Sequence, residues 1–410
     1  MSQLHQNSTR EPDWDAVRSL FRLDPDYIHL GSSQFIASHP LPVREAIGRY
    51  RVLLDSNPVH HTMQLENKKA QEARISAARY MGIGDPNLIA LTDSTTMGLG
   101  MTYAGIHLRE GQEILVSEFS HYSHQESIRK ATERSKARFT EMKLYEHLSS
   151  VTEQGIIEAV LAKVSDKTRI IALTWVHSNS GLKTPVAAIA KSLDPIRERR
   201  AKDDRLLLIV DGVHGFGIET EMFDELGCDI FVTACHKWTY GPRGTGFVAA
   251  TDQAWQEVTP IIPDYTERFK SYSDGNGGPG RMDGKIATPG GFHALEHRWA
   301  LSSSFELMES LGRQHVYNRV HKLNRICKEG LADMGHVQVH TPLKDELSSG
   351  IVAFEVKGMD ASEVVKRLAE KKIIATAAPY RVSYARFTPG IYNSESDIER
   401  ALDAVSSLKA

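Results

Sequence analysis

Short apolar runs alternate with amphipathic stretches between residues 65 and 260. The apolar runs predict buried strands because they are rich in Leu, Ile and Val. They occupy residues 88–92, 113–117, 169–176, 206–210 and 229–232. Helical patterns stand between them at residues 66–81, 95–106 and 156–164. Continuous apolar strands between helices indicate a mostly parallel sheet, of a seven-stranded type, that helices cover on both faces.

The two ends of the chain show a different pattern. A polar arm with a short helix is expected before residue 27, then an extended piece at 27–31 and a helix at 40–55. One long helix is expected over residues 301–333, followed by strands at 350–356, 373–376 and 380–387 and a helix at 361–370. We therefore expect residues 1–44 to be an arm that joins a small domain, residues 45–300 a large domain, and residues 301–410 a small α+β domain. The glycine-rich residues 275–280 interrupt regular structure.

Composition narrows the functional classes. The chain has 410 residues, 41% hydrophobic and 25% charged, which is typical of a soluble protein with a large core. A net charge of −3 gives no electrostatic case for nucleic acid or an anionic membrane. The three cysteines show no metal-ligand spacing, so we expect no metal and a reducing compartment. The polar N-terminus and the lack of a long apolar run favour a cytoplasmic protein with no membrane partner.

A lysine and an aspartate end two of the predicted strands. Lys237 follows residues 229–232, ahead of a Gly/Pro-rich turn, and Asp211 directly follows residues 206–210. Charged groups in such places are costly to bury unless they are paired. The pair fits pyridoxal 5'-phosphate (PLP), because an amine can form the Schiff base and an anion can keep the ring nitrogen protonated. The alternatives are a lysine that leans out to solvent and an aspartate in an ordinary turn.

Three further segments at strand ends carry suitable side chains. Residues 92–98 hold hydroxyl groups at a helix start, which suit a phosphate or serve as an N-cap. His121 could lie against an aromatic ring or relay a proton as a catalytic residue, or it could be an ordinary loop histidine. Asn179 could bond a ring oxygen or belong to a turn, and His214 could also face the ring. Ligands of open α/β sheets bind at the carboxyl ends of strands, where all these segments fall.

The motifs resemble those of class V aminotransferase-fold (fold type I) PLP enzymes, in the branch of isopenicillin N epimerase-like proteins. The resemblance extends over nearly the whole chain. It is carried by Asp211-x-x-His214, by His236-Lys237 and by the glycine-rich residues 241–246. Residues 27–30, 38–47, 288–300 and 386–393 are also similar to segments of that branch.

The resemblance implies a role for each site residue. Lys237 would carry the cofactor and shuttle protons, Asp211 would hold the pyridine nitrogen, and His121 would stack on the ring. Thr288 would reach the phosphate from the other protomer, which implies a homodimer with its active site at the interface. Arg386 would bind a substrate carboxylate. The predicted cofactor-binding set is Ser94, Thr95, Thr96, His121, Asn179, Asp211, His214, Cys235, His236, Lys237 and Thr288; the predicted substrate-binding residues are Arg386 and Gln34. Cys235 either packs beside the lysine or binds phosphate through its amide.

The expected activity is chemistry at Cα of an amino acid or aminoacyl metabolite through an external aldimine. Epimerisation, C–S cleavage and oxidative decarboxylation–deamination all remain open, as does transamination. A desulfurase is disfavoured because Ala234 replaces the serine usual in that group and Cys327 lies in a predicted helix. A non-enzymatic regulator is disfavoured by the complete lysine–aspartate–arginine set.

Overall fold

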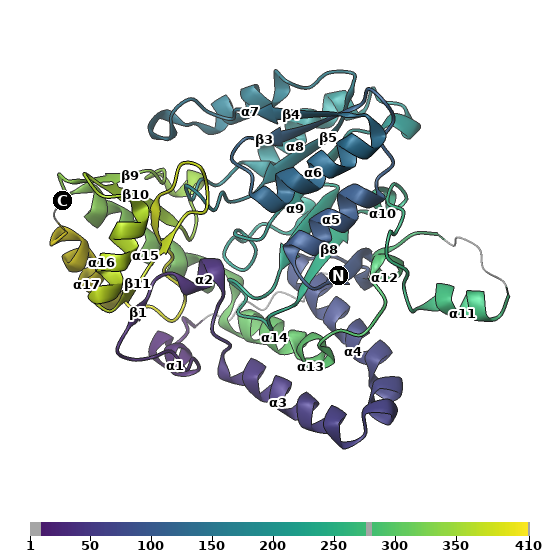
Figure 1. Ribbon diagram of the computed structural model, residues 1–410, viewed down its shortest axis with the longest axis horizontal. Coiled ribbons are helices and arrows are strands. Elements are labelled where there is room, and N and C mark those ends of the chain that lie inside the picture. The colour runs from purple at the N-terminus through teal and green to yellow at the C-terminus, as the bar shows by residue number, and fades with distance from the viewer. Residues whose placement is uncertain (1–9, 276–280, 409–410) are drawn as a thin grey trace.

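The computed structural model describes residues 10–275 and 281–408, and its core is a seven-stranded sheet (Figure 1). The strand order is β2-β8-β7-β6-β5-β3-β4. The strands are β2 (Ile89–Thr92), β3 (Glu113–Ser117), β4 (Arg138–Met142), β5 (Thr168–Thr174), β6 (Leu207–Asp211), β7 (Ile230–Ala234) and β8 (Gly246–Ala250). Only β8 runs antiparallel to its neighbours, β2 and β7. The predicted mostly parallel sheet is thus confirmed.

Helices cover both faces of this sheet, because its strands are apolar on both sides. Every residue of β5, β6 and β7 is buried. One face packs on α5 (Thr95–Gly105), α6 (Tyr122–Ser135), α10 (Asp252–Trp255) and α12 (Gly284–Ala287). The other face packs on α4 (Pro58–Met81), α7 (Glu153–Leu161), α8 (Val186–Arg197), α9 (Phe223–Leu226) and α14 (Leu301–Leu311). The carboxyl ends of the strands therefore emerge between two helical layers.

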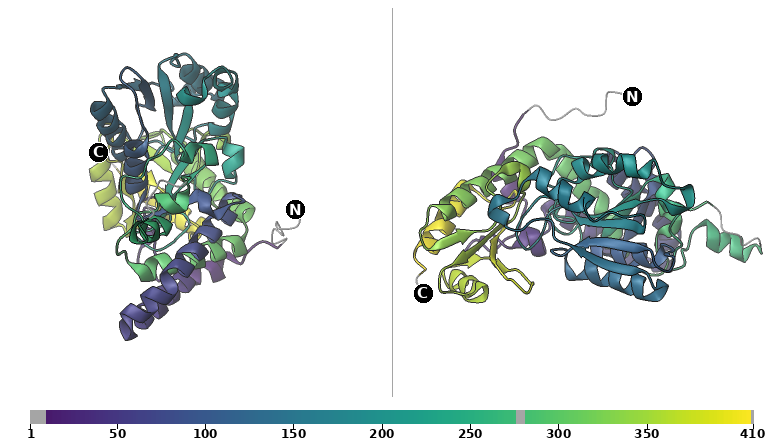
Figure 2. Two further views of the ribbon diagram at one scale, coloured as in Figure 1. Left: turned by 90° about the vertical axis from the view of Figure 1, so that its right-hand side faces the viewer. Right: turned by 90° about the horizontal axis from the view of Figure 1, so that it is seen from above.

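Three further helical segments lie around the large sheet. α3 (Leu41–Ser56) packs on α4 and on α13 (Leu295–Trp299). Figure 2 shows that α3 and α4 extend away from the sheet and that α11 (Glu267–Ser273) stands out on an arm. These elements expose large apolar side chains, including Met63, Phe269 and Tyr272.

A smaller sheet lies beside the large one, in the order β12-β13-β10-β9. Its strands are β9 (Val337–Val339), β10 (Val352–Val356), β12 (Thr376–Ala377) and β13 (Ala385–Phe387), and its helices are α15 (Arg313–Ala332), α16 (Ala361–Glu370) and α17 (Glu395–Ser406). The N-terminal segment, with α1 (Trp14–Ser19) and α2 (Ser32–Phe35), joins this unit through β1 (Ile28–His29). β1 pairs in parallel with β11 (Ile373–Ile374).

Some sequence predictions need correction. The expected helix over 301–333 is two helices, because Gly312 adopts a φ of 82° between α14 and α15. α14 packs on α3 and α4, whereas α15 packs on α17 and the small sheet. Of the expected strand at 380–387 only β13 forms, and the helix expected from 66 begins at Pro58. Most of the glycine-rich segment lies outside the described residues, and the domain boundaries stay a prediction.

Candidate active site

A cavity of about 520 Å³ opens at the carboxyl ends of β5, β6 and β7. Its walls come from both sheets and from α2, α5 and the residues that precede α6. Most of the predicted site residues line it, namely Gln34, Ser94, Thr95, Thr96, His121, Asp211, His214, His236, Lys237 and Arg386. These residues, which the sequence analysis singled out, thus lie together around one cavity, and their assignment as a functional site stays a prediction.

Lys237 follows β7 and faces the cavity. Its Nζ lies 3.2 Å from Nε2 of His214. Burial lowers the pKa of Lys237 to about 8, against the opposing influence of the Asp211 charge. An amine with such a pKa is partly unprotonated near neutral pH, which a nucleophile or a proton acceptor requires.

Asp211 is the last residue of β6 and is 3% exposed. Burial raises the pKa of its carboxyl group to about 6, although the amide of Val213 donates to Oδ1 at 3.2 Å and Lys237 lies nearby. Such a carboxylate is stabilised by a cationic partner, and a protonated ring nitrogen would be one.

Arg386 reaches the cavity from β13 and is 2% exposed. Its guanidinium donates to the carbonyl oxygen of Ser178 at 2.6 Å and to that of Ala377 at 2.9 Å. No carboxylate in the described part of the chain forms an ion pair with it, and burial lowers its pKa to about 10. Each Nη carries a second N–H, so the guanidinium can still donate two hydrogen bonds to a carboxylate.

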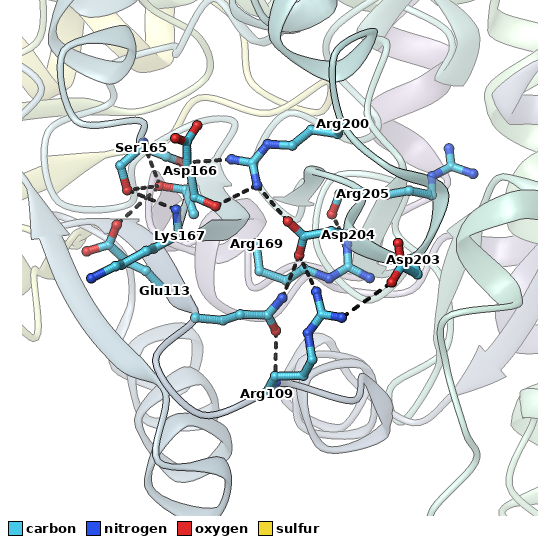
Figure 3. A network of polar contacts seen from close by, with 12 residues as sticks. Arg109, Glu113, Ser165, Asp166, Lys167, Arg169, Arg200, Asp203, Asp204 and Arg205 are labelled. Carbon is cyan, nitrogen blue, oxygen red and sulfur yellow. Dashed lines mark hydrogen bonds and ion pairs between the residues drawn. The ribbon is translucent and has the colours of Figure 1, made fainter.

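At the opposite end of the sheet, arginines pair with carboxylates (Figure 3). At the amino ends of β3 and β5, Asp204 accepts hydrogen bonds from Arg109 at 2.7 Å and from Arg200 at 3.0 Å. The buried Arg169 pairs with Glu257 at 2.9 Å. In the described part of the chain the buried Arg74 also bonds only neutral oxygens, those of Ile89 and Thr288. Arg386 differs because it lines the cavity that Lys237 faces, which makes it a candidate for binding an anionic ligand there.

The start of α5 provides a second place for an anion. Ser94 is the N-cap and accepts a hydrogen bond from the amide of Met97 at 3.1 Å. The buried hydroxyl of Thr95 has no partner among the described residues. The first amides of a helix lack intrahelical acceptors and carry partial positive charge. Ser94 thus serves as the cap, and Thr95 with the helix start can hold a phosphate.

His121 is the N-cap of α6 and lies at the cavity wall. Its Nδ1 accepts from the amide of Ser123 at 3.2 Å, so the hydrogen of the neutral ring sits on Nε2. Burial, with the charges of Lys237 and Arg386, lowers the pKa of His121 and keeps the ring neutral. A neutral aromatic ring at this wall can lie against a cofactor ring.

Three predicted residues lie outside the cavity lining. Asn179 is buried, and its Oδ1 has no partner among the described residues. Cys235 packs in the core and its amide donates to the carbonyl of Thr245 at 2.9 Å, so the suggested amide contact with a phosphate is wrong. The Thr288 hydroxyl bonds Arg74, Leu91 and Gly284 of its own chain, which leaves it no free donor for a phosphate of another protomer.

Sequence reasoning missed several groups at this site. Thr174, Ser178 and Thr376 also line the cavity. The hydroxyl groups of Ser178 and Tyr380 lie 2.6 Å apart, and burial raises the pKa of Tyr380 to about 12. The sequence pattern predicts a strand from residue 380, but Tyr380 lies in a bend before β13. Nothing in the local sequence indicates that it contacts Ser178.

The site as a whole fits PLP. It offers an amine for a covalent bond, a buried carboxylate, an unpartnered hydroxyl at a helix start and a neutral aromatic wall. The model of the aminotransferase class-V family matches residues 36–400. The chain belongs to the class-V aminotransferase family. The recognition from motifs, the predicted fold and the expected PLP cofactor are all confirmed.

The chain is similar to epimerases and to probable cysteine desulfurases. Isopenicillin N epimerase of Streptomyces clavuligerus is 27% identical over 97% of this chain and 98% of its own length. A probable cysteine desulfurase of Pseudomonas putida is 22% identical over 98% of each chain.

Two solved structures of similar fold are a C–S lyase and a cysteine desulfurase. A mutant of the cystine C–S lyase C-DES, with glycine covalently linked to its PLP cofactor, superimposes with a TM-score of 0.84 at 19% identity, covering 97% of this chain and 100% of the other. The cysteine desulfurase CsdA of Escherichia coli gives 0.82 at 19% identity, with 97% and 98% covered. At this identity the likeness shows the fold alone.

The described residues contain neither a membrane-spanning helix nor a cluster of metal ligands. No helix there combines the length and apolar character needed to cross a bilayer. Within the same ranges, no group of His, Cys, Asp and Glu side chains is placed to hold a metal ion.

Proposed function

We propose that this PLP-dependent enzyme acts at Cα of an amino acid or an aminoacyl metabolite, with epimerisation as the first reaction to test. The observation that carries the proposal is Arg386, a buried guanidinium that shares one cavity with Lys237 and has no carboxylate partner among the described residues. A substrate carboxylate bound by Arg386 would place the adjacent Cα inside the cavity that Lys237 lines.

Bound PLP supplies an electron sink for the pair released when a bond to Cα breaks. Lys237 would attach the cofactor and would take or give a proton at Nζ. Asp211 would keep the ring nitrogen protonated, and its buried position would strengthen that interaction. Thr95 and the amides at the start of α5 would hold the phosphate, and the neutral ring of His121 would form a wall for the cofactor.

The cysteines argue against desulfurase chemistry. Cys228, Cys235 and Cys327 are all buried, and none lines the cavity. Burial raises the pKa of Cys327, which lies inside α15. A desulfurase needs a thiolate that reaches the substrate, and a protonated thiol inside a helix does not supply one. The epimerase relative therefore provides the better comparison.

The decisive experiment follows exchange at Cα. The holoenzyme is incubated in D₂O with a panel of amino acids and cysteine conjugates. Chiral chromatography with mass spectrometry then reports inversion, deuterium uptake, elimination or oxidation, and parallel runs with and without dioxygen isolate an oxidative outcome. Formation of pyridoxamine phosphate would instead indicate an aminotransferase. We expect deuterium at Cα together with a mixture of enantiomers.

Lys237→Ala should abolish both the visible absorbance of bound cofactor and the exchange, while Lys163→Ala, at an exposed residue after α7, should keep both. A Lys237→Ala protein that retains both signals would refute the assignment.

A homodimer is part of the proposal. It is supported by the exposed large apolar side chains of α4, α11 and the segment before α13: Met63 and Tyr272 are each 78% exposed, and Phe292 is 89% exposed. Such side chains mark an interface where they form one patch. Sedimentation velocity should give a dimer of this 45.7-kDa chain. A monomer with full cofactor affinity would contradict it. The cytoplasmic location stays a prediction.

A further inference from the structure

Trp238 follows the cavity lysine but points into the core. It is 1% exposed and belongs to the apolar cluster beneath the large sheet. A Cβ atom added at Gly350 would come within 2.6 Å of the Trp238 ring. Gly350 precedes β10, so the small sheet helps to fix the indole. The ring therefore has little freedom to turn.

The indole is joined to the cavity through one histidine. Nε1 of Trp238 donates to Nδ1 of His214 at 3.5 Å, a long hydrogen bond. Nε2 of the same imidazole faces Nζ of Lys237 at 3.2 Å. His214 is 4% exposed, and its pKa is lowered well below the usual value by burial and by the charges of Lys237 and Arg386. The ring is thus neutral and holds a single hydrogen.

The position of that hydrogen follows from the indole. An indole N–H can only donate, so Nδ1 of His214 must be the acceptor and Nε2 must carry the hydrogen. Nε2–H can then donate to the lone pair of an unprotonated Lys237, or to an acceptor atom of the cofactor. In the opposite tautomer, Nδ1–H would meet the indole N–H, and the Nε2 lone pair would instead stabilise the ammonium form of Lys237.

We propose that Trp238 is a positioning residue that holds His214 in the Nε2–H tautomer and so favours the unprotonated, reactive form of Lys237. The inference rests on the proposed function, because it assigns Lys237 as the cofactor lysine. Trp238 itself lies outside the cavity lining and acts through His214.

Other charged groups also face this pair. His236 lies beside Lys237 in the chain, Asp211 ends β6, His121 precedes α6, and Arg386 is on β13. None of them contacts Trp238 through a hydrogen bond that the structure shows. Changing Trp238 therefore alters the His214 tautomer while these charges stay in place.

The test measures the protonation of Lys237 without turnover. The rate at which cofactor-free protein forms the visible adduct with PLP is recorded against pH, and its midpoint reports the amine. Trp238→Phe removes the N–H and keeps an aromatic ring. We expect the midpoint to rise by about one pH unit, the size of one net hydrogen bond. Trp255→Phe, which loses a 3.0 Å bond from Nε1 to the carbonyl of Leu88, is the matched control and should leave the midpoint unchanged.

Two further variants separate this role from simple packing. Replacing Trp238 by β-(3-benzothienyl)-L-alanine exchanges the N–H for sulfur and keeps the ring shape, so it serves even if Trp238→Phe folds poorly. In a His214→Gln background, Trp238→Phe should no longer move the midpoint, because there is no tautomer to fix.

An unchanged midpoint in the benzothienyl variant, or an equal shift in the His214→Gln background, would overturn the inference. Failure of the wild type to form any adduct through Lys237 would instead refute the proposed function.

Discussion

Glu219 lies fully buried where the large domain meets α15, and its replacement by glutamine gives a quantitative test. One carboxylate oxygen accepts from Lys183 at 2.6 Å. The other accepts from His321 of α15 at 2.9 Å and from Ser349 at 2.6 Å. The carboxylate thus joins residues that are far apart in the sequence, and Glu219→Gln removes the charge with almost no change in volume.

The size of the effect follows from the partners that remain. Breaking a buried ion pair costs about 3–5 kcal/mol. Lys183 keeps a second partner, since Glu221 lies 2.8 Å from its Nζ. The glutamine oxygen can also still accept one of the lost bonds. We therefore expect Glu219→Gln to lower the free energy of unfolding by about 3 kcal/mol, at the lower end of that range. The control Glu221→Gln, at a 30% exposed side chain, should cost below about 1 kcal/mol.

The effect should depend on pH in a defined direction. Burial alone would raise the pKa of Glu219, but the hydrogen bond from His321 and the charge of Lys183 lower it. A lowered carboxyl pKa contributes stability above the pKa of the unfolded chain, and this is lost as the pH falls through the folded value. The gap between wild type and Glu219→Gln should therefore narrow below about pH 4.

Urea unfolding followed by both tryptophan fluorescence and circular dichroism would measure the gap at several pH values. Two probes are needed because a chain with two domains need not unfold in one step. A gap below about 1 kcal/mol at pH 7, or one that stays constant down to pH 3, would show that Glu219 does not stabilise the junction as an ion.

Three other predictions concern the cavity and the opposite end of the sheet. Arg386→Lys should raise KM for amino-acid substrates about tenfold or more in steady-state kinetics, because one ammonium cannot replace a planar fork; an unchanged KM would exclude Arg386 as the carboxylate site. In cofactor-free protein, the raised pKa of Asp211, about 6, means that its contribution to stability falls as the pH rises from about 4 to 6. Asp211→Asn should remove this fall in urea titrations, and identical pH slopes in both proteins would contradict it. Asp204→Asn in the network of Figure 3 should cost about 1 kcal/mol or less and leave the cofactor absorbance intact, since Arg109 is 49% exposed; lost absorbance would contradict this.

The sequence predicted the sheet, and grouped residues that lie around one cavity, because both follow from local patterns. Apolar runs define the strands, and ligands bind where parallel strands end, so Asp211 and Lys237 could be placed together. Contacts between distant segments could not be predicted in this way. The bond between Ser178 and Tyr380 joins residues 202 positions apart, and the bonds of the Thr288 hydroxyl depend on Arg74 and Leu91. The helix break at Gly312 depends on one backbone angle, which the helical pattern around it does not reveal.

The pairing of β1 with β11 has a consequence for how the chain matures during synthesis. Ile28 lies opposite Ile373, and the amide of Thr388 donates to the carbonyl of Leu30 at 2.7 Å. Residues 28–30 are therefore synthesised long before the segments with which they pair. Gln34 follows on the same segment, so that wall of the cavity can form only after residues 373–388 have been synthesised. Until then the large sheet can be folded while the cavity beside it lacks the wall that Gln34 forms.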